Sequence, residues 1–175
     1  GDIITIERFK EFEVSVDFRL TKGANSGLKY FVQPNLNQGA GSAFGLEFQM
    51  LDDAVHPDAK LGRDGNRTVS SLYDLMTAKN KRANAIGQWN NAYVVAKGTK
   101  VEHWLNGVRV AVYDLDSDDW HRRVAASKFA GQAGFAKARA ANGQERMLVN
   151  CAGVGGGAQK TASLDRTTGA PKEYP

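Results

Sequence analysis

The sequence is poor in several features that define whole classes of protein. Its 175 residues include one cysteine, Cys151, so no disulfide can form within the chain and a disulfide-stapled fold is excluded. No apolar run approaches the roughly 20 residues that a membrane-spanning helix needs. The first residues lack the basic and apolar regions of a signal peptide, as expected of a mature chain or of a fragment.

Clustered charge is also missing. The net charge is +4 and the pI is near 9.2, but lysine and arginine form no block and do not alternate with aromatic residues. Nucleic-acid binding needs a clustered basic face, so we do not expect it. The 42% of hydrophobic and 24% of charged residues are typical of a globular domain, and the length suits one domain with a sizeable core.

Motifs for nucleophilic catalysis and for tight metal binding are missing too. There is no Gly-x-Ser-x-Gly, and Cys151 has no histidine nearby to activate it, so serine or cysteine hydrolase chemistry is not expected. The 3 histidines lack the spacing of a zinc site. His56 lies in a run with Asp52, Asp53 and Asp58 that could hold a divalent ion loosely, although it lacks the closing Glu of a calcium loop.

The patterns that are present are those of β-structure. Between residues 12 and 20 apolar and polar side chains alternate strictly, which predicts a half-buried strand. Further strands are predicted at residues 28–33, 44–51, 92–96, 100–105 and 108–113. Asn106-Gly107 is the strongest hairpin signal, because a type I′ turn needs positive φ at both positions. A short helix is expected over residues 118–129, with Ser117 or Asp118 as its cap.

This succession of short strands and turns, without alternating strands and helices, predicts an all-β antiparallel sandwich or barrel. Residues 1–154 are expected to form this domain. Residues 155–175 show no core-forming period and are expected to be a low-complexity, poorly ordered tail. The polar connection between residues 52 and 70 is longer than an ordinary loop, and such loops tend to carry function.

Glu47 and Gln49 are the sharpest candidates for chemistry. They are two apart in the strand predicted at residues 44–51, so their side chains project from one face, opposite the apolar face. In a bent sandwich that face could be the floor of a sugar cleft, with Glu47 as acid or base and Gln49 bound to hydroxyls. A solvent-exposed polar face is the alternative.

Three aromatic residues and one histidine are further candidates, each with an ordinary alternative. Trp89, Trp104 and Tyr73 could stack on sugar rings, whereas burial in the core is the more common fate of such residues. His103 shares its strand face with apolar residues, which is typical of a packed and hydrogen-bonded histidine.

Six segments in a fixed order carry a resemblance to a known family. They read FEVSVDFR from residue 12, GANSGL from 23, GLEFQMLD from 45, SLYDL from 71, GQWN from 87 and VEHWLNG from 101. Together they resemble the 3-keto-disaccharide hydrolase family over residues 1–135. The resemblance implies a concanavalin-like jelly-roll sandwich with one or two short helices, and a periplasmic or extracellular location.

The resemblance also has gaps. Family members begin some tens of residues earlier, with a strand that contains a Phe-Asn-Gly-like segment, and end with Leu-Gln-Asp-His-Gly and Arg-Asn-Ile blocks. None of these is found here, and residues 143–157 stand where the Asp-His pair is expected. We therefore expect a fragment, or a copy with an altered C-terminus, with open sheet edges and an incomplete cleft.

For the chemistry, the resemblance implies cleavage of glycosides that carry a ketone at C3. The ketone acidifies the C2 proton, so a base can remove it, the C1 substituent leaves and water adds back. Glu47 is the implied acid or base, with His103 and Asp52 as second catalytic groups. The other implied residues are Gln49, Arg19 and Asn25 for substrate binding, and His56 or Asp52 beside a divalent ion that could polarise the ketone.

Three alternatives stay open at this point. Direct hydrolysis by a carboxylate pair is the competing mechanism. A non-catalytic carbohydrate-binding sandwich, or an inactive fragment of an enzyme, is one competing function, and a structural domain with the same fold is the other.

Overall fold

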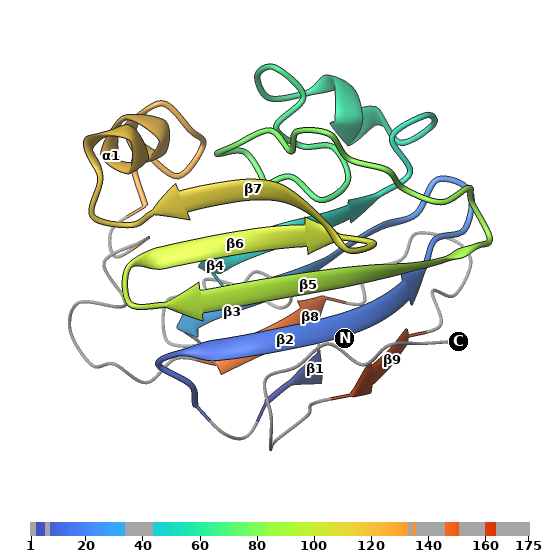
Figure 1. Ribbon diagram of the computed structural model, residues 1–175. Helices are drawn as coiled ribbons and strands as arrows, with labels where there is room; N and C mark the ends of the chain where they lie inside the picture. Colours follow the sequence, from blue (N-terminus) through green and yellow to red (C-terminus); the bar gives the residue numbers. More distant parts are fainter. Residues whose placement is uncertain are drawn as a thin grey trace.

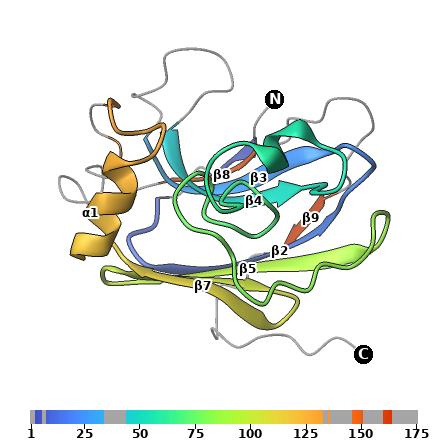
Figure 2. The ribbon, with the colours of Figure 1, turned by 90° about the horizontal axis from the view of Figure 1, so that it is seen from above.

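Two antiparallel sheets pack face to face in the computed structural model, which describes residues 3–5, 8–33, 44–132, 135, 146–150 and 160–163. Figure 1 shows the five-stranded sheet in front, and Figure 2 shows the two layers edge-on. The strand order of this sheet is β7 (Val108–Asp114), β6 (Lys100–Leu105), β5 (Trp89–Lys97), β2 (Phe12–Arg19) and β9 (Lys160–Ser163). The order of the four-stranded sheet is β1 (Ile3–Ile4), β8 (Arg146–Asn150), β3 (Asn25–Gln33) and β4 (Phe44–Leu51). The predicted all-β sandwich is confirmed.

The core between the sheets explains why the strands alternate. In β2 every second side chain from Phe12 to Phe18 is buried, and the side chains between them are partly exposed. Phe48 and its alternate neighbours in β4 belong to the same buried cluster, from the opposite sheet. Burial of one such side chain contributes roughly 1.5–3 kcal/mol. This energy decides which face of each strand points inward, as the period of two predicted.

The hairpin between β6 and β7 follows from two residues. Asn106 and Gly107 have φ angles of 49° and 76°, the left-handed backbone that a type I′ turn requires. The Asn106 Oδ1 also accepts the Asn91 N–H at 2.7 Å, which joins the turn to β5. The predicted turn is confirmed, and the flanking strands match their predicted bounds to within one residue.

The helix α1 (Asp118–Ala125) begins at the predicted cap and is shorter than predicted. The Ser117 Oγ accepts the Trp120 N–H at 3.1 Å. The helix ends at Ala125, before residue 129, where the Ser127 N–H donates to the Val124 carbonyl at 3.1 Å, three residues back instead of four. Trp120 is buried and stacks on Tyr113 with 5.7 Å between ring centroids, which anchors α1 to the five-stranded sheet.

The long connection between β4 and β5 lies along the same edge of the sandwich as α1 (Figure 1). It contains the 3-10 helix η2 (Pro57–Lys60) and a stretch that pairs with β4. The Ser70 N–H donates to the Gln49 carbonyl at 2.7 Å, and the Tyr73 N–H donates to the Glu47 carbonyl at 3.0 Å. This stretch therefore lies beside the strand that carries both candidate residues.

The C-terminal region differs from the expectation where it is described. Most of residues 155–175 lies outside the described residues, but β9 falls within this segment and pairs with β2. In the other sheet, β8 lies between β1 and β3. Neither strand is predicted by the sequence pattern, because segments this short show no clear period. None of the helices in the described part of the chain is long and apolar enough to cross a membrane.

Candidate functional site

A cavity opens on the outer face of the four-stranded sheet, opposite the core. Glu47 of β4 stands directly opposite Lys29 of β3 in the strand register, so both side chains project from this face. The cavity has a volume of about 320 Å³, at the lower end of the roughly 300–1,000 Å³ of small-molecule sites. Its walls are completed by Phe44, Gly45, Tyr73, Lys128, Phe129 and Gln132.

Gly27 makes room for the Glu47 side chain. Gly27 lies two residues before Lys29 in β3, and a Cβ atom added there would collide with the Glu47 carboxylate. The Glu47 side chain therefore lies across β3 at a position where the neighbouring strand has no side chain. Glu47 is only partly buried and lines the cavity.

A network of ion pairs holds Tyr73 in the cavity wall. The Arg67 side chain lies 3.0 Å from Asp58 Oδ1 through Nη1 and 2.6 Å from Asp74 Oδ1 through Nε. The Tyr73 hydroxyl donates to Asp58 Oδ2 at 2.9 Å. Burial and this bond to a carboxylate raise the pKa of Tyr73, so the phenol stays protonated as a donor at neutral pH. Hydrogen bonds to charged groups are the stronger kind, and here they fix the ring.

Lys128 brings a cation to the cavity from the segment after α1. Its backbone N–H donates to Asp74 Oδ2 at 2.7 Å, which ties this segment to the loop. Its Nζ lies 4.1 Å from the centroid of the Tyr73 ring, close enough for a cation–π contact. Burial, and next the charge of Arg67, lower the pKa of Lys128, while the charge of Glu47 acts in the opposite direction.

This arrangement suits the removal of a proton from carbon. A carboxylate such as that of Glu47 can take the proton. The ammonium groups of Lys29 and Lys128 can stabilise the negative charge that then develops on a neighbouring carbonyl oxygen. Phe129 adds apolar surface of the kind that packs against the C–H face of a sugar ring. Phe44 also lines the cavity, but it packs against the core between the sheets.

Gln49 and Asn25 lie on the same sheet face but do not line the cavity formed by the described residues. Gln49 is 1% exposed, and its Oε1 has no hydrogen-bond partner within the described part of the chain. Asn25 stands opposite Leu51 in the register of β3 and β4 and is partly buried. The prediction that Gln49 shares the face of Glu47 is confirmed, because Gln49 and Glu47 pair with Gly27 and Lys29 on β3.

Asp52 and His56 both bind backbone donors of the loop. The buried Asp52 carboxylate accepts the Gly23 N–H at 2.8 Å and the Ala54 N–H at 3.2 Å. The His56 Nδ1 accepts the Asp58 N–H at 3.2 Å at the start of η2. Within the residues that the structure describes, no three His, Cys, Asp or Glu side chains form a group that could hold a metal ion.

Arg19, Trp89 and Trp104 lie on the outer face of the five-stranded sheet. Arg19 stands opposite Trp89 in the register of β2 and β5, and its guanidinium lies 5.2 Å from the ring centroid. The structure does not bring Arg19 and Glu47 together, because their strands belong to different sheets. Trp89 is 43% exposed, so the alternative that it belongs to the core is wrong.

His103 lies fully buried between the two sheets and does not reach the cavity. Its Nδ1 is 3.1 Å from the Ser70 carbonyl oxygen, and its Nε2 is 2.5 Å from the Tyr30 hydroxyl, which also bonds to the Tyr113 hydroxyl. Because a carbonyl can only accept, Nδ1 carries the proton and Nε2 accepts from Tyr30. Burial lowers the pKa of His103 to about 4, so the imidazole is neutral at pH 7.

Lys29 and Lys128 are not among the site residues predicted from the sequence. Lys29 could have been found from the sequence. It lies two residues after Gly27, and the strand that carries both residues is the antiparallel hairpin partner of β4. Lys128 carried no local signal, because only its tertiary contact with Asp74 brings it to the cavity.

The fold and the cavity define the class: a concanavalin-like jelly-roll sandwich with a polar cavity on the outer face of one sheet. Two solved structures from Parabacteroides distasonis, both assigned as glycosyl hydrolases, share this fold. One has a TM-score of 0.76 and 25% sequence identity, and covers 91% of this chain and 70% of its own. The other has a TM-score of 0.67 and 18% identity, and covers 91% of this chain and 79% of its own.

The family model described as the 3-keto-alpha-glucoside-1,2-lyase-like domain matches residues 1–144, and the chain belongs to this family. A 3-keto-disaccharide hydrolase of Bacteroides thetaiotaomicron is 39% identical in an alignment 139 residues long that covers 74% of this chain and 48% of that protein. The chain thus spans about half the length of this relative. The resemblance inferred from six short segments is confirmed.

Proposed function

We propose that this chain cleaves the glycosidic bond of 3-keto-glycosides by elimination followed by hydration. The observation that carries the proposal is the placement of Glu47 in one cavity with the ammonium groups of Lys29 and Lys128. Family membership and the name of the Bacteroides relative support the substrate class.

In the first step, the Glu47 carboxylate takes the proton from C2, and the electrons of the C2–H bond form an enolate whose oxygen was the C3 ketone. Lys128 and Lys29 stabilise this enolate oxygen by their charge. In the second step the ketone re-forms, and the bond from C1 to the leaving oxygen breaks as that oxygen gains a proton. Water then adds its hydroxyl to C1 and a proton to C2, which gives a reducing 3-keto sugar.

The composition of the cavity favours this route over direct hydrolysis. Direct hydrolysis uses two carboxyl groups roughly 5–10 Å apart. Among the described residues that line the cavity, only Glu47 carries a carboxyl group. The Asp58 carboxylate behind the wall is already bound by Arg67 and Tyr73. A single carboxylate with nearby cations is what proton abstraction next to a ketone requires.

The test is turnover of a 3-keto-disaccharide by the purified chain, with release of the reducing sugar followed by chromatography. We expect Glu47→Gln to lower turnover at least about a hundredfold, because a general base contributes roughly 10²–10⁴-fold. Glu11→Gln is the matched control, since this exposed side chain lies outside the cavity and accepts the Gly98 N–H at 2.8 Å. Equal turnover of the two variants would refute the role of Glu47.

Isotopes separate the two mechanisms. Deuterium at C2 of the substrate should slow elimination, and a reaction in deuterated water should place deuterium at C2 of the product. Neither effect is expected of direct hydrolysis. Parallel reactions with EDTA test the divalent ion that the resemblance suggested. A folded chain that binds the sugar without turnover would instead support the carbohydrate-binding alternative.

The resemblance also supports a periplasmic or extracellular location for the native protein. Fractionation of the source cells, with detection by an antibody to this chain, would test it. Detection in the cytoplasmic fraction alone would contradict it.

A further inference from the structure

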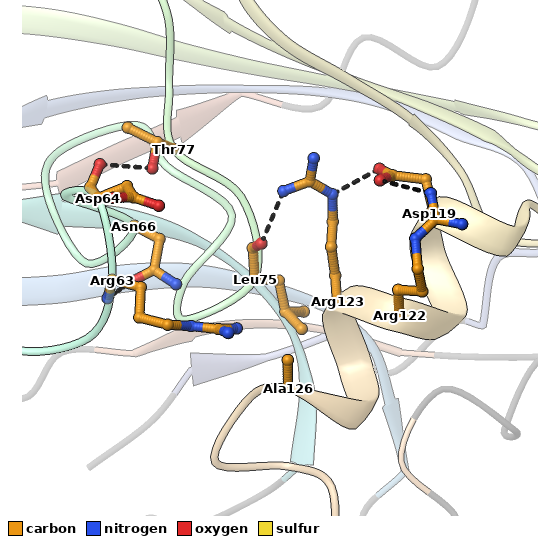
Figure 3. A pocket seen from close by; sticks show the side chains of 9 residues that line it. All are labelled: Arg63, Asp64, Asn66, Leu75, Thr77, Asp119, Arg122, Arg123 and Ala126. Atoms are coloured by element: carbon orange, nitrogen blue, oxygen red, sulfur yellow. Dashed lines mark hydrogen bonds and ion pairs between the residues drawn. The ribbon is translucent and has the colours of Figure 1, made fainter.

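A second cavity lies between the loop of residues 61–77 and α1 (Figure 3). Its volume is about 330 Å³, close to that of the cavity with Glu47. The reaction proposed above does not use it. Its walls carry three guanidinium groups, one from the loop and two from α1: Arg63, Arg122 and Arg123. We call it the arginine cavity.

The two arginines of α1 share one carboxylate. The Arg123 Nε lies 2.5 Å from Asp119 Oδ2, and its Nη1 donates to the Leu75 carbonyl at 3.3 Å, so this guanidinium bridges helix and loop. The Arg122 Nη2 lies 3.4 Å from Asp119 Oδ1, and its side chain is 72% exposed. A long bond at an exposed position contributes little, so within the described part of the chain most donors of the Arg122 guanidinium remain for another partner.

Arg63 lines the arginine cavity from the loop. Its backbone N–H donates to Asn66 Oδ1 at 2.9 Å, which fixes the loop at this residue. Its side chain extends toward α1, and no hydrogen bond or ion pair joins its guanidinium to the other residues drawn in Figure 3. The remaining charged residue of the wall is Asp64. With Asp119, the cavity therefore has two carboxylates and three guanidinium groups.

We propose that the arginine cavity binds an oxyanion, either the carboxylate of a sugar acid or inorganic phosphate. A guanidinium offers parallel N–H donors that match two oxygens of such a group, and Arg63 is placed to supply them. Arg122 and Arg123 add positive charge on the opposite wall. The site is separate from the cavity with Glu47, so this proposal does not rest on the proposed function.

Isothermal titration calorimetry with D-glucuronate, inorganic phosphate and D-glucose tests the proposal without any turnover. Glucose controls for binding through hydroxyls alone. Arg63→Gln should weaken binding of the anions about tenfold, which corresponds to about 1.4 kcal/mol. Asp119→Asn should strengthen it, because the change frees Arg122 and Arg123. Arg82→Gln removes the same charge at an exposed position and should leave binding unchanged.

Each outcome is decisive once the melting temperatures show that the variants are folded. Tighter binding of glucuronate than of phosphate, lost in Arg63→Gln, supports the proposal with a sugar acid as the ligand. Tighter binding of phosphate with the same dependence supports it with free phosphate as the ligand. If neither anion shows saturable binding, or if Arg63→Gln and Asp119→Asn bind like Arg82→Gln, the proposal is overturned.

Discussion

Replacement of His103 by glutamine separates a structural role of this histidine from a catalytic one. In the folded chain His103 donates through Nδ1 to the Ser70 carbonyl and accepts at Nε2 from the Tyr30 hydroxyl. A glutamine side chain has one donor group and one acceptor group but does not titrate. We therefore expect His103→Gln to remove a pH dependence of stability, whatever constant cost the new side chain adds.

The magnitude follows from the shift in pKa. The ordinary value for His103 is 6.5, and burial lowers it to about 4 in the fold. Between these values the unfolded chain binds a proton that the folded chain does not, so stability rises with pH across this window. The contribution of neutral His103 to the free energy of unfolding is fully present above pH 6.5 and is lost as the pH falls toward 4. At 1.36 kcal/mol for each pKa unit, the full effect is about 3 kcal/mol.

Urea unfolding at several pH values measures this directly. Between about pH 7 and pH 5, the free energy of unfolding of the unmodified chain should fall by about 2 kcal/mol more than that of His103→Gln. Parallel pH curves for the two proteins would refute the reasoning. The pH profile of turnover should keep its shape in the variant, because His103 lies outside the cavity.

Three further changes test other parts of the structure. In Gly27→Ala the new methyl group displaces the Glu47 carboxylate, so turnover should fall at least about tenfold. The overpacking should also lower the free energy of unfolding by roughly 1–3 kcal/mol. Unchanged turnover would contradict the role of Gly27. Trp120→Ala removes the buried anchor of α1 and should lower the free energy of unfolding, measured in urea, by roughly 3–5 kcal/mol. A decrease below about 1 kcal/mol would show that the anchor is dispensable. Arg67→Met leaves the Asp58 and Asp74 carboxylates without their cation and should lower the free energy of unfolding by about 3 kcal/mol. Because Tyr73 loses its support, KM should rise by a larger factor than kcat falls. A change confined to kcat would argue against that support.

Part of the candidate site could be predicted because it depends on local geometry. The spacing of Glu47 and Gln49 within one strand is enough to place both side chains on one face. Whether each then meets ligand, solvent or protein depends on distant segments. The stretch that ends at Tyr73 lies beside β4, and Gln49 is buried while Glu47 reaches the cavity.

The same reasoning explains the misplaced candidates. Arg19 alternates with core residues just as Glu47 does, so the period of two cannot tell their sheets apart. A histidine can occupy either a core or a catalytic position. Only the buried contacts of His103 with Tyr30 and Ser70 distinguish the two.

The sequence by itself determined the strands β2 to β7, the Asn106-Gly107 turn, the inward face of each of these strands and the family. The strands, the turn and the inward faces depend on residues close together in the chain, where alternation and turn geometry act directly. The family is visible in the order of six short segments. The tertiary structure alone decided which strands share a sheet and that Lys128 joins Glu47 in one cavity. It also decided that Arg63 faces α1. These features arise from contacts between segments far apart in sequence, which local patterns do not specify.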